Sequence, residues 1–528
     1  MKKMYFKNIL LVILWMAPVS WTAPLRGSAE GDVVRPPTIV LIYTDDQGYG
    51  DVSALNSEAK FSTPHIDRIA REGMIFSDGH SSDGVCTPSR YSLLTGRYSW
   101  RTSLKQGVVG AEGACLIEED RMTLASLLKE HGYHTGMVGK WHLNMDFPGE
   151  PGSRNWQEPI TDGPPDRGFD YYWGIAASMN FGILTYIDNR HVVEPAHMWT
   201  RKKHIEEPYR DYRLRPSYDS VRKHEDDLEV APSFRDAFVL EDLTEKAVDF
   251  IEQHAEAARR GRPFFLYVAL TSPHLPHAVH PAFVDSSECG KYGDFMTETD
   301  HRVGQLLDVL DREGLTDETL VIFTSDNGPE NNYRYQETAH GHRCSYIFKG
   351  GKRDIYEGGH RVPFLMRWPG VIEPGRVVEN PVCQVDFLAT FADILATPLP
   401  DNAGEDSYSL LPLMKDENVL ADFRGGIIHH SSRGYFAIRD GDWKLNMLRG
   451  SGGSLRPVFF SPGEDKPPFE LYNIREDPGE TQNVIREHPE IASKLERMIT
   501  RYIEEGRSTP GLPQPYVKED WDQLIWMQ

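Results

Sequence analysis

Runs of apolar residues alternate with amphipathic stretches through most of the chain. Five runs have the length and hydrophobicity of buried parallel strands: Thr38–Thr44, Thr135–Gly139, Phe264–Leu270, Thr319–Thr324 and Val362–Arg367. Four stretches show helical periodicity: His65–Glu72, Leu124–Glu130, Thr297–Arg312 and Gln384–Leu395. Because strands and helices alternate, the pattern predicts an α/β domain with a mostly parallel sheet.

The pattern changes after about residue 420. Short strand-like pieces at Tyr435–Arg439 and Trp443–Asn446 are separated by Gly and Asp turns, and a helix is predicted at Glu490–Glu505. These features predict a small antiparallel sheet with one helix. We therefore expect a main domain at 36–420 and a C-terminal subdomain at 421–528.

The N-terminus has the pattern of an export signal. A basic start precedes an apolar run: Lys2, Lys3, Lys7 and Ile9–Met16. The run is short for a membrane span, and no second apolar run of spanning length follows. We predict a signal peptide within residues 1–29, cleaved after Ala23 or Ala29, and a protein exported to the periplasm or the medium, without a stable membrane span.

The chain is acidic, with a formal net charge of −22. Residues 1–29 hold four basic residues and no acidic one, so their removal gives −26. Such a surface disfavours binding to nucleic acid and to anionic membranes. It also repels an anionic substrate, so a site for one must carry its own local positive charge.

The five cysteines argue against a disulfide scaffold. Their number is odd, and no CxxC pair occurs. One cysteine is therefore left for another role. The pattern leaves the pairing of the other four open: Cys115, Cys289, Cys344 and Cys383.

Polar residues follow four of the predicted strands at their carboxyl ends. They are Asp45 and Asp46, Lys140 and His142, His274, and Asp326 and Asn327. In open α/β sheets ligands bind at the carboxyl ends of the strands. We therefore expect these side chains to meet in one site.

The carboxylates and the amide of this set are all oxygen donors. Asp45, Asp46, Asp326 and Asn327 form a ligand set that a hard cation such as calcium prefers over zinc. Three carboxylates placed together would repel one another without a cation. Capping of loops is the alternative role, since Asp and Asn are common in turns. The combined set favours a metal.

Cys86 lies in the segment VCTPSRYSLLTGR. Pro88 suits the first position of a helix and Thr87 can cap it, so the amino end of that helix would point toward Cys86. Such an end is an anion site, and Arg90 lies one turn further on. The alternative is a small buried cysteine, the usual place of a free thiol.

The segment CTPSR followed by LLTGR resembles the signature of the type I sulfatases, which oxidise this cysteine to formylglycine (3-oxoalanine). Further similar segments are DDQGYGD at 45–51, TPHIDRIAREG at 63–73, GKWHL at 139–143, TSPH at 271–274, SDNG at 325–328, GGKRDIYEGGHRVPF at 350–364 and FELYNIREDPGETQN at 469–483. The resemblance covers about residues 36 to 480, and these motifs together are highly specific.

The resemblance implies a fold similar to alkaline phosphatase, with a large mixed sheet between helices and a small C-terminal sheet domain. The main domain would then be catalytic. It implies a calcium ion bound by four side chains and the modified cysteine: Asp45, Asp46, Asp326, Asn327 and Cys86. A formylglycine-generating or sulfatase-maturating enzyme would be a partner of the chain.

The resemblance also implies the catalytic roles. One hydroxyl of the hydrated aldehyde at Cys86 attacks sulfur, and the second later allows sulfate to leave. His274 protonates the leaving oxygen, and His142 takes up the proton of the second hydroxyl. Lys140 and Lys352 hold the sulfate oxygens, while Arg90 steadies the hydrated aldehyde. Substrate would therefore contact Lys140, His274 and Lys352. On an extended segment Lys140 and His142 would point the same way.

The substrate is the least determined feature. The segments YSLLTGRYSWRT and RGFDYYWGIAAS resemble bacterial exo-sulfatases related to N-acetylgalactosamine-6-sulfatase, which implies 6-O-sulfate on a terminal galactose or N-acetylgalactosamine. Two alternatives stay open: a phosphonate or phosphodiester hydrolase of the same superfamily, and a non-catalytic protein that binds sulfated glycan. Five further residues could line the pocket or serve the fold: His277, His340, His342, His360 and Arg361.

Overall fold

The computed structural model describes residues 36–201, 218–417, 423–459, 467–518 and 521–527. The predicted signal peptide and its two cleavage sites lie outside these residues. So does the predicted domain boundary near residue 420, which stays a prediction. Within the described part of the chain, no helix has both the length and the apolar character needed to cross a bilayer.

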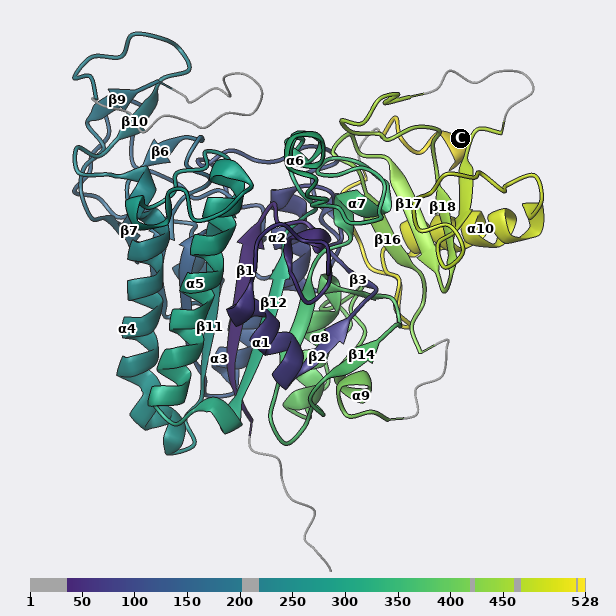
Figure 1. Ribbon diagram of the computed structural model, residues 1–528, viewed down its shortest axis with the longest axis horizontal. Helices are drawn as coiled ribbons and strands as arrows, with labels where there is room; N and C mark the ends of the chain where they lie inside the picture. Colours follow the sequence, from purple (N-terminus) through teal and green to yellow (C-terminus); the bar gives the residue numbers. More distant parts are fainter. Residues whose placement is uncertain (1–35, 202–217, 418–422, 460–466, 519–520, 528) are drawn as a thin grey trace, which may run out of the picture. The chain divides into compact units, whose positions relative to one another are not determined.

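A ten-stranded mixed sheet forms the centre of the fold (Figure 1), in the order β14-β2-β13-β12-β1-β11-β4-β5-β7-β8. Its strands are β1 (Thr38–Asp45), β2 (Met74–Phe76), β4 (His134–Lys140), β5 (Tyr171–Ile175), β7 (Ile187–Asp188), β8 (His191–Val192), β11 (Phe264–Pro273), β12 (Thr319–Ser325), β13 (Phe364–Arg367) and β14 (Arg376–Val378). The strands β12, β1, β11, β4 and β5 run parallel. The predicted mixed, mostly parallel sheet is confirmed.

Both faces of this sheet are buried under helices, which explains the uninterrupted apolar runs. Ile39, Leu41 and Tyr43 of β1 face one hydrophobic cluster, and the alternate residues Val40 and Ile42 face the other. The first cluster includes side chains from α2 (Cys86–Thr95), α3 (Leu124–Glu130) and α8 (Phe387–Ile394). The second includes side chains from α1 (Pro64–Glu72), α4 (Val239–Arg259) and α5 (Gly290–Arg312). A strand covered on both faces needs no polar alternation.

The predicted small antiparallel sheet is also present. It comprises β16 (Ile427–His430), β17 (Phe436–Asp440), β18 (Trp443–Asn446) and β19 (Glu470–Asn473), and α10 (Pro489–Glu505) packs against it. Its core includes Ile428, Leu445 and Ile499, together with Tyr98 and Trp100 from the main part of the chain. These two aromatic side chains join the small sheet to the segment that follows α2.

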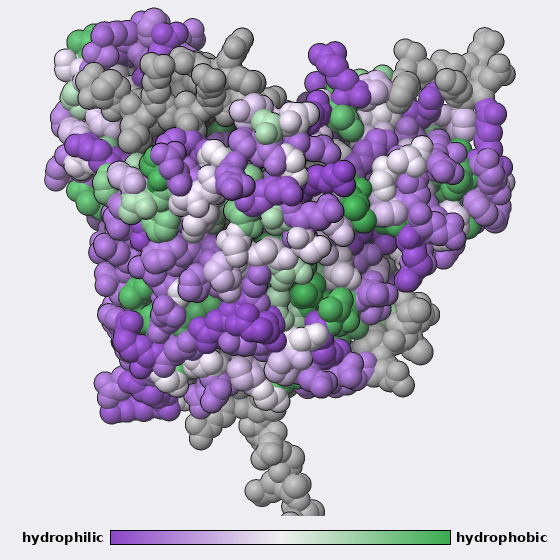
Figure 2. All heavy atoms as spheres, in the orientation of Figure 1, coloured by the Kyte–Doolittle hydropathy of each residue, from purple (hydrophilic) through white to green (hydrophobic). Residues whose placement is uncertain are grey.

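Shorter elements surround the two sheets. They are β3 (Gly79–His80), which pairs with β15 (Val382–Cys383); the sheet of β6 (Ile183–Leu184), β10 (Leu228–Val230) and β9 (Met198–Thr200); and the helices α6 (Tyr333–His340), α7 (Glu357–His360) and α9 (Leu411–Met414). Figure 2 shows a mainly hydrophilic face on which hydrophobic residues form small, separate patches.

Some helix bounds differ from the sequence prediction. The helix expected from Thr297 begins at Gly290, and the stretch expected to be helical from Gln384 starts with a 3₁₀ turn before α8. The 21-residue helix α4 was not predicted. In α5 the first turns contain Gly290 and Gly293, which weaken the sequence signal, yet Tyr292 and Phe295 are buried there.

Candidate active site

The carboxyl ends of β1, β4, β11 and β12 meet at one edge of the sheet, as predicted. Asp45 and Lys140 are the last residues of β1 and β4, while His274 and Asp326 directly follow β11 and β12. The Lys140 Nζ lies 2.6 Å from Asp45 Oδ2, and the backbone N–H of Asp46 donates to Asp326 Oδ1 at 3.0 Å. The parallel register therefore brings the four segments together.

Three buried carboxylates form the floor of this site. Asp45, Asp46 and Asp326 are at most 1% exposed. Burial, together with the charges of Asp45 and Asp326, raises the pKa of Asp46 to about 7, although Lys352 opposes the shift. Burial and Asp45 likewise raise the pKa of Asp326. Burial also acts on Asp45, but Lys140 and Arg90 outweigh it and lower its pKa. The cluster thus holds more negative charge than it accommodates easily.

The donor set fits a hard cation. The Asn327 Oδ1 atom is buried and has no hydrogen-bond partner among the described residues, while its amide nitrogen donates to Asp46 Oδ1 at 2.8 Å. One ligand atom from each of Asp45, Asp46, Cys86 and His274 lies within 4.8 Å of the others. An unsatisfied amide oxygen beside three carboxylates is an arrangement that calcium would complete.

Cys86 is the first residue of α2, and Val85 occupies the position before the helix. The prediction that Thr87 caps a helix starting at Pro88 is therefore wrong. The Thr87 hydroxyl instead donates to the carbonyl of His142 at 3.0 Å, because the helix starts earlier and Thr87 faces the loop after β4. Cys86 itself still lies at the helix amino end, where the predicted anion site is expected.

The thiol of Cys86 is held in its unreactive form. It is 3% exposed, and its Sγ lies 3.7 Å from Asp45 Oδ1. Burial raises the pKa of Cys86 to about 12, and the lysines only partly oppose this shift. Because the thiolate is the nucleophilic form of cysteine, the unmodified side chain is a poor nucleophile here.

Three cations surround the carboxylates. The Arg90 Nη2 atom donates to Asp326 Oδ2 at 2.8 Å and lies 3.6 Å from Asp45 Oδ1. The Lys352 Nζ donates to Asp46 Oδ2 at 2.7 Å. Burial opposes the charge of Lys352, but Asp46 raises its pKa above the ordinary value, so the ammonium stays protonated. Together with Lys140, these cations balance the three carboxylates, so a net positive charge for an anion site would come from a bound cation.

The two histidines each have one ring nitrogen fixed by a backbone carbonyl. The His142 Nε2 atom lies 3.1 Å from the Val109 oxygen, and its Nδ1 has no partner among the described residues. The His274 Nδ1 atom lies 2.5 Å from the Leu275 oxygen, and its Nε2 is 3.7 Å from Asp46 Oδ2. Since a carbonyl only accepts, these contacts set the tautomers and leave Nδ1 of His142 and Nε2 of His274 as the basic atoms.

The expectation that Lys140 and His142 share an extended segment is wrong. The strand β4 ends at Lys140, and His142 has a φ of 57° in the left-handed region. The chain turns there, which directs Lys140 to the carboxylate cluster and brings His142 to the wall of a cavity. Both residues reach the site, but by different backbone conformations.

A cavity of about 440 Å³ opens above this floor. Four of the predicted residues line it: Cys86, His142, His274 and Lys352. The cavity is also lined by residues that the sequence analysis did not assign to the site: Val85, Gly107, Val108, Asn180, Phe181, Leu275, Glu330, Arg353, Ser432 and Arg433. Val85 and Arg353 lie inside recognised segments and Glu330 lies two residues after SDNG, so their place in the sequence could have indicated these three.

The five histidine and arginine residues left open are not among those that line the cavity. His342 lies 2.7 Å from Asp51 Oδ1, and His360 lies 3.0 Å from His80 in a buried cluster. Arg361 pairs with Glu357 at 2.7 Å. All five cysteines are free thiols in the structure.

Comparisons of the chain with known proteins all identify the same family. The sulfatase family model matches residues 37–397, and the model of the N-sulphoglucosamine sulphohydrolase C-terminal region matches 348–505. The chain is 32% identical over 492 residues to the N-acetylgalactosamine-6-O-sulfatase of Bacteroides thetaiotaomicron, covering 89% of this chain and 94% of that protein. It is 34% identical over 468 residues to human arylsulfatase A, covering 86% and 84% of the two chains.

Solved structures agree with these matches. A structure from work on the metabolism of multiple glycosaminoglycans by Bacteroides thetaiotaomicron has a TM-score of 0.74 and 31% identity, covering 88% of this chain and 99% of the other. The structure of Ps i-CgsB in complex with k-i-k-neocarrahexaose has a TM-score of 0.65 and 25% identity, covering 91% and 95%. With its fold, its site and these relatives, the chain belongs to the sulfatase family and is a sulfuric ester hydrolase.

Proposed function

We propose that this sulfatase removes a 6-O-sulfate from a terminal galactose or N-acetylgalactosamine of a saccharide. The observation that carries the proposal is the cavity, because Cys86, His142, His274 and Lys352 face one space above a buried carboxylate cluster. One relative is named for N-acetylgalactosamine 6-O-sulfate, and one similar structure holds an oligosaccharide. These names support a sugar substrate for this chain.

The proposed reaction depends on two groups. A calcium ion would be held by Asp45, Asp46, Asp326 and Asn327 together with residue 86. Formylglycine would replace Cys86 through a maturating enzyme, and this exchange accounts for a reactive residue where the thiol is inert. When bound, the ion would withdraw charge from the oxygens it touches, and the aldehyde hydrate would supply the nucleophilic hydroxyl. We propose that the protein works after export, as the N-terminal sequence predicts.

The histidines would move the protons of the reaction. We propose that the basic Nδ1 of His142 takes a proton from a hydroxyl on residue 86, since its Nε2 is held by Val109 and both residues line the cavity. His274 would give its proton to the leaving sugar oxygen from Nε2. Burial, Lys352 and Lys140 hold the pKa of His274 well below its ordinary value. The acid role therefore requires the negative charge of bound sulfate to raise that pKa again.

The cations would bind the sulfate oxygens. Lys140 and Lys352 already donate to carboxylates of the floor, at 2.6 and 2.7 Å. An ammonium has three donor hydrogens, so each lysine can keep that bond and also donate to a sulfate oxygen. Arg90 would hold the carboxylates in place through Asp326. Together with the bound ion, these cations would account for an anionic substrate on an acidic protein.

The proposed selectivity is tested with paired esters on the wild-type protein. We expect sulfate to be released from N-acetylgalactosamine 6-sulfate or galactose 6-sulfate on the order of 100-fold faster than from the 4-sulfate. We expect the same advantage over release of phosphate from the 6-phosphate. The reason is that the cavity would accept an ester at one ring position and of one charge. Ion chromatography of the released anion measures all four rates. A phosphate rate equal to the sulfate rate would favour the alternative of a phosphonate or phosphodiester hydrolase. Binding without any release would favour a glycan-binding protein.

Metal removal provides an independent prediction. After chelation we expect loss of activity and of about 3 kcal/mol of stability relative to protein in calcium at 100 times its Kd, since the folded carboxylate cluster binds the ion and the unfolded chain does not. Thermal melting with and without added calcium measures the shift, and elemental analysis gives the stoichiometry. The Asp46→Asn variant serves as control and should melt independently of calcium. Stoichiometric zinc, or a wild-type melting point that ignores calcium, would contradict the prediction.

A further inference from the structure

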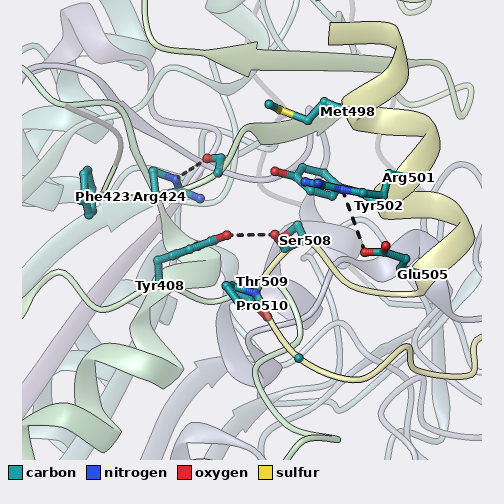
Figure 3. A pocket seen from close by; sticks show the side chains of 12 residues that line it. Tyr408, Phe423, Arg424, Met498, Arg501, Tyr502, Glu505, Ser508, Thr509 and Pro510 are labelled. Atoms are coloured by element: carbon teal, nitrogen blue, oxygen red, sulfur yellow. Dashed lines mark hydrogen bonds and ion pairs between the residues drawn. The ribbon is translucent and has the colours of Figure 1, made fainter. Parts of the chain in front are cut away.

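A second cavity lies in the C-terminal part of the chain. Its volume is about 510 Å³, within the usual range for ligand pockets. Figure 3 shows Tyr408, Phe423 and Arg424 on one side and Met498, Arg501, Tyr502 and Glu505 of α10 on the other, with Ser508 between them and Thr509 and Pro510 below. Nothing in the reaction described above uses this space.

Strand β16 connects the two cavities. Gly425, just before the strand, lines the second cavity, and Ser432 and Arg433, just after it, line the active-site cavity. Seven residues at about 3.3 Å each span at most roughly 20 Å, which sets an upper bound on the distance between these lining residues. The second cavity is therefore distinct from the active site but belongs to the same rigid sheet.

Two buried polar atoms in the wall of the second cavity have no partner among the described residues. They are Nη2 of Arg424 and Oγ of Ser508. Arg424 is ion-paired with Asp386 and donates through Nε to the Gly425 oxygen at 3.2 Å. A buried donor without a partner is unfavourable, so an acceptor that reaches it from the cavity would be favoured.

A third polar group of the cavity is loosely held. The side chain of Arg501 is 57% exposed and its closest approach to Glu505 is 4.0 Å, at the limit of an ion pair. Its guanidinium also lies over the ring of Tyr502, 5.2 Å from the ring centre. An exposed pair with this geometry contributes little, so Arg501 can turn to a ligand at small cost.

The wall chemistry indicates the class of ligand. The guanidinium groups of Arg424 and Arg501 only donate, and their planar shape matches a carboxylate or a sulfate. The ring of Phe423, which is only partly buried, offers apolar surface for the face of a sugar ring. We propose that this cavity binds an acidic sugar unit, bearing a carboxylate or a sulfate, of the polymer whose end enters the active site. The proposal extends the proposed function, but its test measures binding and does not depend on turnover.

The separation of the sites has a measurable consequence. A monosaccharide reaches one site at a time, whereas a chain long enough to span roughly 20 Å can occupy both. The second contact then becomes intramolecular and raises the apparent affinity for long chains without changing the chemistry. The second cavity would thus select polymeric over small substrates.

The test uses full-length protein with Cys86→Ala, which prevents turnover, and a fluorescent octasaccharide of alternating uronic acid and 6-O-sulfated N-acetylgalactosamine. We expect Arg501→Ala in this background to weaken binding by about tenfold, the loss of one charge-assisted hydrogen bond. Fluorescence anisotropy measures the affinity. A desulfated octasaccharide separates the two sources of charge, because it loses the active-site sulfate for parent and variant alike. An Arg501→Ala effect that persists on this probe identifies the carboxylate, and an effect that disappears identifies the sulfate.

A matched control and a second readout keep the result specific. Arg486→Ala removes an exposed arginine of the same region that does not line the cavity, and it should bind the probe as the parent does. With Cys86 intact, Arg501→Ala should leave kcat/KM on the monosaccharide sulfate unchanged and raise KM on the octasaccharide. Equal octasaccharide affinity in Arg501→Ala and its parent overturns the proposal, since the cavity would then hold only water. If no sugar released sulfate, the proposed function would be overturned, but the binding result could still be interpreted.

Discussion

Replacement of Cys86 by alanine is expected to lower turnover by roughly three decades or more and to leave the fold intact. Burial raises the pKa of the thiol to about 12, so we expect the activity to come from the proposed formylglycine form of the residue. An alanine at this position cannot be converted to formylglycine. The side chain is small, so the vacated space should cost only on the order of 1 kcal/mol of stability. Steady-state release of sulfate and thermal melting measure the two effects.

Two further variants make this result specific to Cys86. Cys86→Ser places a single hydroxyl at the same position, and we expect at most one equivalent of sulfate per protein molecule, because the second hydroxyl of a hydrated aldehyde is missing. Cys383→Ala removes another buried free thiol outside the site and should turn over normally. Mass spectrometry of the wild-type peptide should show a loss of about 18 Da at Cys86. Multiple turnovers by Cys86→Ala would refute the mechanism.

Loss of either lysine of the site is expected to lower kcat/KM by roughly two decades or more, the scale for removing one preorganised donor to developing charge. The contacts lie in a buried site and are poorly screened, so added salt should change the wild-type rate only modestly. Kinetics of Lys140→Ala and Lys352→Ala across ionic strength measure both effects. Removal of Lys352 also takes the paired ammonium away from buried Asp46, so melting curves should accompany the kinetics.

The chain offers a closely matched control for Lys352. Lys494 lies 2.7 Å from Asp440, the same distance that separates Lys352 from Asp46, but its side chain is 60% exposed against 5% for Lys352. We expect Lys494→Ala to leave kcat/KM unchanged, because exposed pairs contribute little. If Lys352→Ala behaves like Lys494→Ala, the sulfate does not bind where we place it.

The sequence predicted the central strands and the residues at their ends well. The double burial of β1 makes an uninterrupted apolar run, and such a run ends where polar residues such as Asp45 begin. Since parallel strands end at one edge, the meeting of Asp45, Lys140, His274 and Asp326 followed from the strand assignment alone. The hydrophobic pattern and the parallel topology are therefore enough to predict that part of the site.

The walls of the cavity could not be predicted in the same way. Ser432 and Arg433 come from the loop between β16 and β17, and only the packing of the small sheet brings them to the cavity. The pairing of Glu330 with Arg353 likewise depends on two loops that meet in space. No periodic pattern in the sequence indicates the left-handed φ of His142 or the hydrogen bond from Thr87 to the same loop. Such contacts depend on tertiary packing, which local propensity does not encode.

The central position of β1 also has a consequence for the order in which the chain is made. Its two neighbours, β11 and β12, end at Pro273 and Ser325. Neither edge of β1 can therefore form its hydrogen bonds until long after β1 has been synthesised. From Cys86 to the end of β12 a ribosome adds about 240 residues, which takes roughly 10 to 50 seconds. Once the sheet closes, Cys86 is 3% exposed. An enzyme that oxidises this sulfur therefore has to reach it on the unfinished or still unfolded chain.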